Sequence, residues 1–264
     1  MLDKSRLSAP IEEPQNLSDS EIARFDKLAE SWWDPNGQYK TALAFNQARV
    51  QEMLRVVSKK YGKPVSGTLL KGKTVLDVGS GGGLICEPFA RHGADVLGID
   101  ASALSVEVAK RHAESQSLDI TYLHQLAEDK AAEGGQYDIV INAEVVEHVP
   151  DQQALIAQCA RMVKPGGLLF LATLNRTFKS YIVAIVGAEY IMRYLPVGTH
   201  DWKKFVKPEE LNAWTGDNLG LIHETGMRMN PLTKIWSCCD SVAVNYLQCY
   251  QASDNFGDDD AEDS

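Results

Sequence analysis

A glycine-rich turn follows a short apolar run in the first half of the chain. The segment reads Val75-Leu76-Asp77-Val78-Gly79-Ser80-Gly81-Gly82-Gly83, and it predicts a buried strand, a tight turn and a helix that begins near Leu84. Glycines in such a turn let the backbone approach a ligand closely. Asp100 ends the next predicted strand, 21 residues beyond Gly79, where a doubly wound fold places a carboxylate on ribose hydroxyls. Together, the two features predict a site for a nucleoside cofactor.

A second group of reactive side chains follows the fourth predicted strand. Glu144, Glu147 and His148 stand at positions i, i+3 and i+4. A helix that starts just beyond the strand would project all three from one face, and two oxygen ligands with an imidazole suit a hard cation or acid–base catalysis. The alternative is a pair of acids stabilised by the helix N-terminus, with a histidine packed nearby. Without a metal, His148 or His200 becomes the candidate general base.

The elements that would position these residues alternate along the chain. Five short apolar runs are predicted to be strands: 74–78, 95–99, 120–124, 137–142 and 168–173. Helical stretches lie between most of them, which predicts an α/β fold: a Rossmann-like, mostly parallel central sheet with helices on both faces. Residues 241–249 are expected to form a last strand that closes the sheet.

A helical N-terminal extension is predicted over residues 18–72. Its first helix, capped by a serine at 18 or 20, carries an apolar stripe that ends in Trp32-Trp33. This tryptophan pair either forms a lid over the cofactor or packs as ordinary core. A second helix is expected from about 42 to 60.

The remaining boundaries follow from composition and spacing. Residues 1–17 are expected to form a disordered leader, and 251–264 an acidic, disordered tail. The domain that holds the sheet would then span 73–250. Within it, 175–230 is too long for a simple connection after the fifth strand and is predicted to contain an insertion.

Composition excludes several classes of function. The 264-residue chain carries 36 acidic and 26 basic side chains, a net charge of −10, and offers no broad basic face for nucleic acid. Its five cysteines contain no Cys-x-x-Cys pair, which argues against a disulfide framework and a structural zinc site and fits a reducing cytoplasm. The first 20 residues show no signal peptide or mitochondrial presequence.

The glycine turn is similar to the first motif of class I S-adenosylmethionine-dependent methyltransferases, in which an acid precedes Gly-x-Gly-x-Gly. Leu84 stands where the dinucleotide fingerprint has its third glycine, which disfavours NAD and a nicotinamide oxidoreductase. More specific segments resemble the family of ubiquinone-biosynthesis O-methyltransferases, over a region from about Glu21 to Tyr246. These segments are 31–34, 46–49, 142–150, 173–176, 186–191 and 198–201.

This resemblance implies a reaction and a set of cofactor contacts. The family methylates polyprenylated catechol and hydroquinol intermediates with S-adenosylmethionine, in both O-methylation steps of ubiquinone synthesis. It implies that Arg49, Gly79, Asp100 and Ala143 contact the cofactor, and Gly81 belongs to the same turn. A bidentate guanidinium at Arg49 suits the methionine carboxylate, whereas the alternative for Arg49 is a helix-surface ion pair.

The resemblance also implies that Glu144, Glu147 and His148 hold Mg²⁺, because eukaryotic relatives look magnesium-dependent. A phenol has a pKa of about 10 and must lose its proton to attack the sulfonium methyl at neutral pH. A coordinated cation would stabilise the resulting catecholate.

A membrane partner is expected from the apolar segment 179–195, which basic residues flank. It is too short to span a bilayer, but a helix of this kind either lies in a membrane interface or packs on the protein's own core. The expected location is therefore cytoplasmic and peripheral on the inner membrane face, and the resemblance implies other ubiquinone-pathway enzymes as partners. The rival functions are methylation of another catechol-type acceptor and a non-catalytic lipid-binding scaffold.

Overall fold

The structure of the protein is a computed structural model that describes residues 7, 16, 18–34, 40–181 and 201–254. The predicted base His200 and most of the predicted membrane segment 179–195 lie outside these residues. The predicted leader and acidic tail also lie largely outside them. No helix of the described chain is long and apolar enough to cross a membrane.

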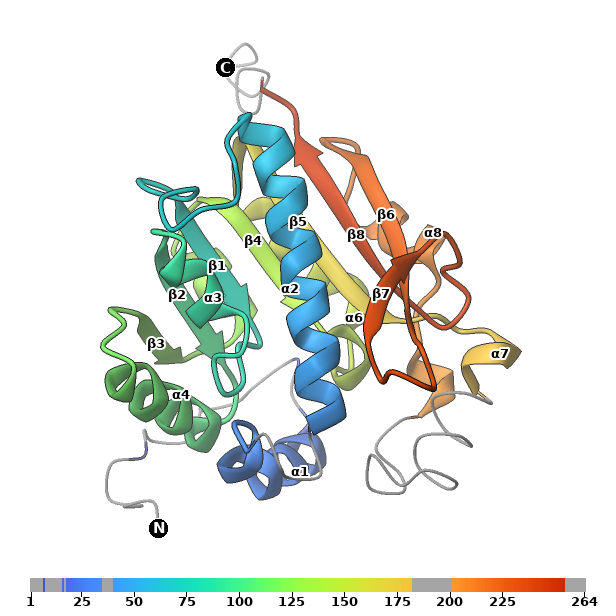
Figure 1. Cartoon of the computed structure of the whole chain (residues 1–264), viewed down its shortest axis with the longest axis horizontal. Coiled ribbons are helices and arrows are strands. Elements are labelled where there is room, and N and C mark those ends of the chain that lie inside the picture. The colour runs from blue at the N-terminus through green and yellow to red at the C-terminus, as the bar shows by residue number, and fades with distance from the viewer. Residues whose placement is uncertain (1–6, 8–15, 17, 35–39, 182–200, 255–264) are drawn as a thin grey trace, which may run out of the picture.

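A twisted sheet forms the centre of the molecule (Figure 1). Among the described residues it has eight strands in the order β3-β2-β1-β4-β5-β8-β6-β7. β1 to β5 are mutually parallel, and β8 runs antiparallel between β5 and β6. The strands are β1 (Thr74–Val78), β2 (Asp95–Asp100), β3 (Thr121–His124), β4 (Tyr137–Ala143), β5 (Val163–Leu174), β6 (Leu219–Met229), β7 (Trp236–Cys239) and β8 (Asn245–Ala252). The predicted mostly parallel, Rossmann-like sheet is confirmed.

Helices cover both faces of this sheet. The α-helices are α1 (Asp19–Leu28), α2 (Lys40–Tyr61), α3 (Cys86–Arg91), α4 (Ala103–Ser115), α5 (Ala127–Ala132), α6 (Gln152–Arg161), α7 (Phe178–Ser180) and α8 (Pro208–Trp214). The described residues also contain three short 3-10 helices: η2 (Ala29–Ser31), η3 (Val146–His148) and η5 (Trp202–Lys204). α2, α3 and α4 pack on one face, and α5, α6 and α8 pack on the other.

The core follows from the period of the strands. Successive strand residues point to opposite faces, so Ile139 and Ile141 of β4 join the core under α2 and α3, while Val140 joins the core under α6. All three are fully buried. Strands that bury both faces read as continuous apolar runs, which is why the sequence predicted the parallel part of the sheet so well.

The C-terminal part of the sheet differs from the prediction. The strand expected at 241–249 begins later, at Asn245, and does not close the sheet, because β6 and β7 lie outside it. The expected insertion at 175–230 is also too long: it includes α8 and β6, which belong to the core layers and the sheet. Gln251 and Ala252, expected in the tail, pair with β5 and β6.

Candidate active site

A cavity of about 770 Å³ opens at the carboxyl ends of the parallel strands, between the sheet and the N-terminal helices. In open α/β sheets this is the edge where ligands bind. The structure brings all the predicted site residues into its lining: Arg49, Gly79, Gly81, Asp100, Ala143, Glu144, Glu147 and His148.

The glycine turn between β1 and α3 requires glycine. Gly79 and Gly81 have φ angles of +78° and +50°, a backbone region that residues other than glycine rarely adopt. A Cβ on Gly79 would lie 2.3 Å from the Val145 side chain, and one on Gly81 would lie 2.6 Å from the Trp32 ring. Glycine is therefore required at both positions, by the positive φ angles and by the close packing of Val145 and Trp32.

Asp100 is fixed to this turn at the end of β2. Its two carboxylate oxygens accept hydrogen bonds from the backbone N–H groups of Gly81 and Ser102, each at 2.8 Å. Burial raises the pKa of Asp100. The two hydrogen bonds favour the ionised form and aim the carboxylate along the cavity wall.

Arg49 lies on α2 and is almost fully buried, with 6% of its surface exposed. One Nη donates to the Glu144 carboxylate at 2.6 Å, and the other donates to the Asn46 side chain at 2.8 Å. Its Nε atom has no hydrogen-bond partner within the described part of the chain. The ion pair therefore joins a buried Arg49 to a partly exposed Glu144 in the cavity lining, in place of the helix-surface pair that was the alternative.

Glu144, Glu147 and His148 do not share a helix face, and that expectation was wrong. Glu144 has a φ of +59°, which breaks a right-handed helix, and only Val146–His148 form a short 3-10 turn. The side chains take separate partners. Glu144 pairs with Arg49, the buried Glu147 accepts from Thr173 Oγ1 at 2.9 Å, and His148 Nδ1 lies 2.9 Å from Glu21.

This divergence bears on the predicted magnesium site. The described residues contain no group of three or more His, Cys, Asp and Glu side chains placed to hold a metal ion. In this arrangement the three residues do not fit the ion, because each is held by a different neighbour.

Two tryptophans after α1 cover the glycine turn. Trp32 packs on Gly81 and Gly82, as the close approach to their backbone shows. Trp33 donates its indole N–H to the Gly82 carbonyl at 2.8 Å and stacks on the His112 ring at 3.7 Å. The contacts show that the pair packs on the glycine turn, and a lid over the cofactor stays a prediction.

The sequence assigned no role of its own to Asp77, the acid inside the glycine motif. Asp77 is 2% exposed and lines the cavity, and it accepts a hydrogen bond from the Cys86 thiol at 3.2 Å. Burial raises the pKa of Asp77 to about 7, although the thiol and the nearby Arg49 oppose the shift. Its place two residues before Gly79 was the available signal.

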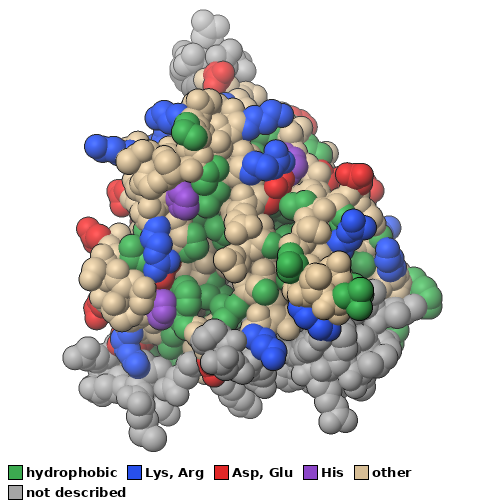
Figure 2. Space-filling view, in the orientation of Figure 1, with side chains coloured by type: hydrophobic (Ala, Val, Ile, Leu, Met, Phe, Trp, Pro, Cys, Tyr) green, Lys and Arg blue, Asp and Glu red, His purple; other side chains and the backbone are tan. Residues whose placement is uncertain are grey.

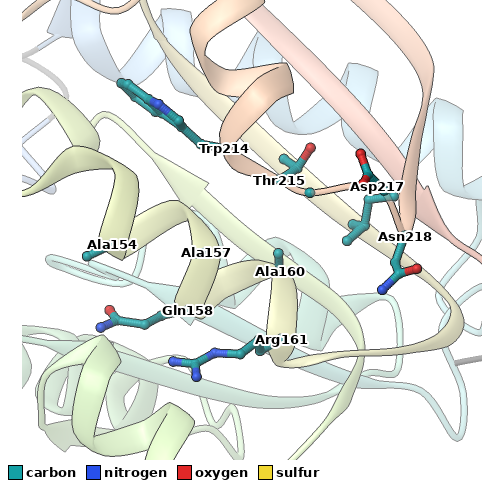
Figure 3. Close-up of a pocket in the computed structure, with 11 residues that line it drawn as sticks. Ala154, Ala157, Gln158, Ala160, Arg161, Trp214, Thr215, Asp217 and Asn218 are labelled. Atoms are coloured by element: carbon teal, nitrogen blue, oxygen red, sulfur yellow. The ribbon is translucent and has the colours of Figure 1, made fainter. Parts of the chain in front are cut away.

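A second hollow, of about 440 Å³, lies on the other face between α6, α8 and the start of β6 (Figure 3). Its wall includes Gln158 and Arg161 of α6 and Trp214 of α8. None of the predicted site residues lines it. The larger cavity is therefore the candidate active site.

Comparisons with known proteins agree with this geometry. A family model described as a methyltransferase domain matches residues 76–171. The ubiquinone biosynthesis O-methyltransferase of Brucella ovis is 47% identical over 230 residues, which are 86% of this chain and 93% of that protein. The protein of the same name from Dinoroseobacter shibae is 44% identical over 237 residues, 88% of this chain and 95% of its own.

Solved structures show the same fold at low identity. The magnesium protoporphyrin IX methyltransferase of Synechocystis, with bound SAH, superposes with a TM-score of 0.64 at 21% identity, over 88% of this chain and 95% of that one. The plantazolicin methyltransferase in complex with SAH superposes with a TM-score of 0.59 at 12% identity, over 89% and 98%.

Proposed function

The chain belongs to the family of ubiquinone biosynthesis O-methyltransferases, and we propose that it catalyses both O-methylation steps of ubiquinone synthesis. Its cofactor is S-adenosylmethionine, and its reaction is the transfer of a methyl group. The proposed acceptors are a polyprenylated catechol and a polyprenylated hydroquinol. One observation carries the proposal: a single cavity unites the glycine turn, Asp100 and Arg49 with an apolar wall from other elements.

That apolar wall lies on the side of α2, β6 and β7. Met227 and Met229 of β6 line it together with Phe45 of α2 and Trp236 of β7. The rings of Phe45 and Trp236 are 4.7 Å apart between centroids. Aromatic and thioether side chains suit a flat ring that carries an isoprenoid tail.

Asp100 and Arg49 would hold the two ends of the cofactor. An ionised carboxylate has about four acceptor positions, and Asp100 uses two of them on backbone N–H groups. Two remain for the ribose hydroxyls. The buried Arg49 cation would bind the methionine carboxylate with donors that now serve Glu144 or, in the case of Nε, serve no described residue.

His148 is our proposed general base. Its Nδ1 lies 2.9 Å from the Glu21 carboxylate. The hydrogen bond with His148, helped by Arg24, lowers the pKa of Glu21 to about 2 although burial opposes the shift. The ionised Glu21 favours the tautomer of a neutral His148 that carries its proton on Nδ1, and in that tautomer Nε2 is an acceptor. His148 lines the cavity, so Nε2 can take the proton of the phenol.

Methyl transfer then needs alignment more than further chemistry. The phenolate oxygen forms a bond to the methyl carbon, and the methyl–sulfur bond breaks as its electron pair returns to sulfur. The positive sulfonium becomes a neutral thioether, and no covalent enzyme intermediate forms. The elements around the cavity supply orientation, which contributes much of the rate in such reactions.

We also propose that the enzyme works in the cytoplasm at a membrane surface, because a polyprenyl acceptor resides in the bilayer. Other enzymes of the same pathway are proposed partners, since their products would be its substrates.

The test is methyl transfer from labelled S-adenosylmethionine to a short-chain polyprenyl catechol and to the matching hydroquinol. Each reaction is run with magnesium and with a chelator, on the wild type and on Glu144→Ala. We expect transfer to both acceptors that survives chelation, because the three candidate ligands do not converge.

Each other outcome has a distinct meaning. Loss of activity upon chelation and in Glu144→Ala would restore the metal role. Cofactor binding, measured by calorimetry, without transfer to either acceptor would contradict the proposed function and favour the lipid-binding scaffold. Transfer to only one of the two acceptors would limit the enzyme to a single step.

A further inference from the structure

The side chain of Glu147 carries a buried oxygen atom that lacks a partner. Figure 2 shows that the acidic side chains of the visible face lie mostly around its edges, in contact with solvent. Glu147 is instead 3% exposed. Its Oε1 atom is buried and has no hydrogen-bond partner among the described residues. A buried acceptor without a partner is costly, so each such atom in a native structure needs an explanation.

The other oxygen of the same carboxylate is held in place. Glu147 Oε2 accepts a hydrogen bond from Thr173 Oγ1 at 2.9 Å. Thr173 is fully buried in β5 and does not line the cavity, whereas Glu147 does. Among the buried atoms without a partner in the described cavity wall, Glu147 Oε1 is the one that belongs to a carboxylate. Thr173 therefore fixes a carboxylate whose free acceptor is available to a ligand in the cavity.

Glu147 lies between the two halves of the cavity. The strand order β2-β1-β4-β5-β8-β6 places Asp100, at the end of β2, on one side and Met227 of β6 on the other. Thr173, which holds Glu147, belongs to β5 and so lies between them. The proposed base His148 is the next residue in the chain. Glu147 is thus on the side of the glycine turn where the acceptor is proposed to bind, away from Asp100.

The chemistry of a catechol fits this arrangement. A catechol carries a second hydroxyl group beside the one that is methylated. Each hydroxyl offers one O–H donor, and a carboxylate oxygen is a strong acceptor. A ring that presents one hydroxyl to His148 can therefore present the neighbouring hydroxyl to Glu147.

We propose that Glu147 binds the hydroxyl that is not methylated and so selects aromatic acceptors with two neighbouring hydroxyls. Oε1 accepts the hydrogen bond from that hydroxyl, while Thr173 holds Oε2. A hydroquinol whose third hydroxyl neighbours one of the other two belongs to the same class. The inference rests on the proposed function, because it names the feature by which the proposed acceptor is recognised. It requires no metal ion.

The test compares the binding of two short-chain prenyl compounds to the full chain saturated with S-adenosylhomocysteine. One is the catechol, and the other is the monophenol that lacks the second hydroxyl. Calorimetry in the presence of a chelator gives both affinities. Wild type is expected to bind the catechol roughly 10- to 100-fold more tightly, because only the catechol gains a hydrogen bond to a carboxylate.

Replacement of Glu147 should remove this preference. In Glu147→Ala the two compounds should bind about equally, and in Glu147→Gln the preference should shrink because an uncharged amide replaces the carboxylate. Thr173→Val should reduce the preference in part, since Oε2 loses its donor and Oε1 is no longer fixed. The readout is the ratio of the two affinities, because general damage to the fold weakens the binding of both compounds alike.

The matched control is Glu144→Gln, the same change in a second carboxylate of the same cavity. Glu144 pairs with Arg49, so its replacement should leave the ratio at the wild-type value. An equal loss of preference in Glu144→Gln, or an unchanged ratio in both Glu147 variants, would overturn the proposal. So would a wild-type preference that appears only when magnesium replaces the chelator, which would assign the second hydroxyl to a metal ion.

This measurement involves no turnover, so it is separate from the test of the proposed function. Preference for the catechol without methyl transfer to either proposed acceptor would contradict the proposed function and support the role of Glu147 in binding. Methyl transfer to the catechol by a wild type that binds both compounds equally would support the proposed function and contradict the role of Glu147.

Discussion

At the scale of single residues, the buried Arg49 cation is paired with the Glu144 carboxylate. A bound cofactor would bring a second carboxylate to the same guanidinium. Since Arg49 Nε has no partner within the described residues, the cation has donors to spare. Cofactor binding is therefore expected to depend on this one side chain.

We expect Arg49→Ala to weaken binding of S-adenosylhomocysteine by roughly 10- to 100-fold, because a charge-assisted bidentate contact is lost. Binding of 5′-methylthioadenosine, which lacks the amino-acid part, should change little. Calorimetry with both ligands makes the comparison. Equal weakening of both would show that Arg49 acts through the fold of the site.

The proposed base gives a second prediction at this scale. His148→Asn should lower kcat by roughly 100- to 1,000-fold with little effect on the KM for the cofactor, since general-base catalysis contributes about that much. Glu21→Gln should lower kcat by a smaller factor, because it removes the group that orients the ring. Steady-state kinetics with a short-chain catechol test both variants. Unchanged kcat in His148→Asn would assign the proton to another acceptor.

Asp77 predicts how stability depends on pH. Burial raises its pKa in the folded state from 3.8 to about 7, so the folded protein binds a proton that the unfolded chain lacks between these values. Stability from this group is full below pH 4 and falls as the pH rises to about 7. Asp77→Asn should thus be more stable than wild type at pH 8, by on the order of a few kcal/mol.

Urea unfolding at several pH values between 4 and 8 checks this expectation, with the difference between the two proteins as the readout. Other titrating groups cancel in that difference. A stability gap that is constant with pH would mean that Asp77 stays ionised in the folded protein.

At the scale of elements, the glycine turn and the tryptophan cover depend on each other. Gly81→Ala should destabilise the protein by about 1–3 kcal/mol, because the new Cβ meets the Trp32 ring and the φ of +50° is strained. Trp32→Ala added to Gly81→Ala should restore only the part of the lost stability that the contact between the Cβ and the ring causes. Thermal unfolding of the two single variants and the double variant separates the contributions.

The elements also show what sequence reasoning could reach. β1, β2 and β4 were predicted nearly to the residue, because strands buried on both faces are continuous apolar runs. β6 was missed since its burial is mixed and Leu221 and Ile222 stay exposed. β6 pairs antiparallel with β8, which comes later in the chain. No local sequence pattern reveals such a pairing.

The candidate site divides in the same way. The glycine turn and Asp100 could be predicted, because a backbone conformation and a strand end fix them. The geometry of Glu144, Glu147 and His148 could not, since spacing alone does not reveal the φ of +59° at Glu144. Their partners Arg49, Thr173 and Glu21 come from three different elements, and only the folded chain brings them together.

At the scale of the whole molecule, charged side chains stabilise the end of the sheet that lies opposite the cavity. At the amino-terminal ends of β1, β4 and β5, Asp138 accepts hydrogen bonds from Lys73, Lys164 and Thr74. Burial opposes ionisation, but these partners together hold the pKa of Asp138 well below its usual range. The brace lies at the strand ends opposite the cavity, so the two ends of the sheet have separate tasks.

This division predicts the behaviour of Asp138→Asn. The depressed pKa stabilises the fold above pH 4, and that contribution is lost as the pH falls through the folded-state pKa. The variant should lose about 1–3 kcal/mol at pH 7, yet bind S-adenosylhomocysteine as wild type does. Chemical unfolding and calorimetry provide the two readouts. A parallel loss of cofactor affinity would show that the ends of the sheet are coupled.

The cover over the glycine turn has a kinetic consequence. α1 is tied to the body by Glu21 to His148, by Asp26 to Ser102 and, just beyond the helix, by Trp33 to Gly82. In the proposed binding mode, the spent cofactor would lie beneath these ties after each turnover, and the methylated lipid would face the other wall. Exchange of the spent cofactor therefore requires these hydrogen bonds to break at the same time. We expect the steady-state rate to be limited by this exchange and to show strong inhibition by the demethylated cofactor.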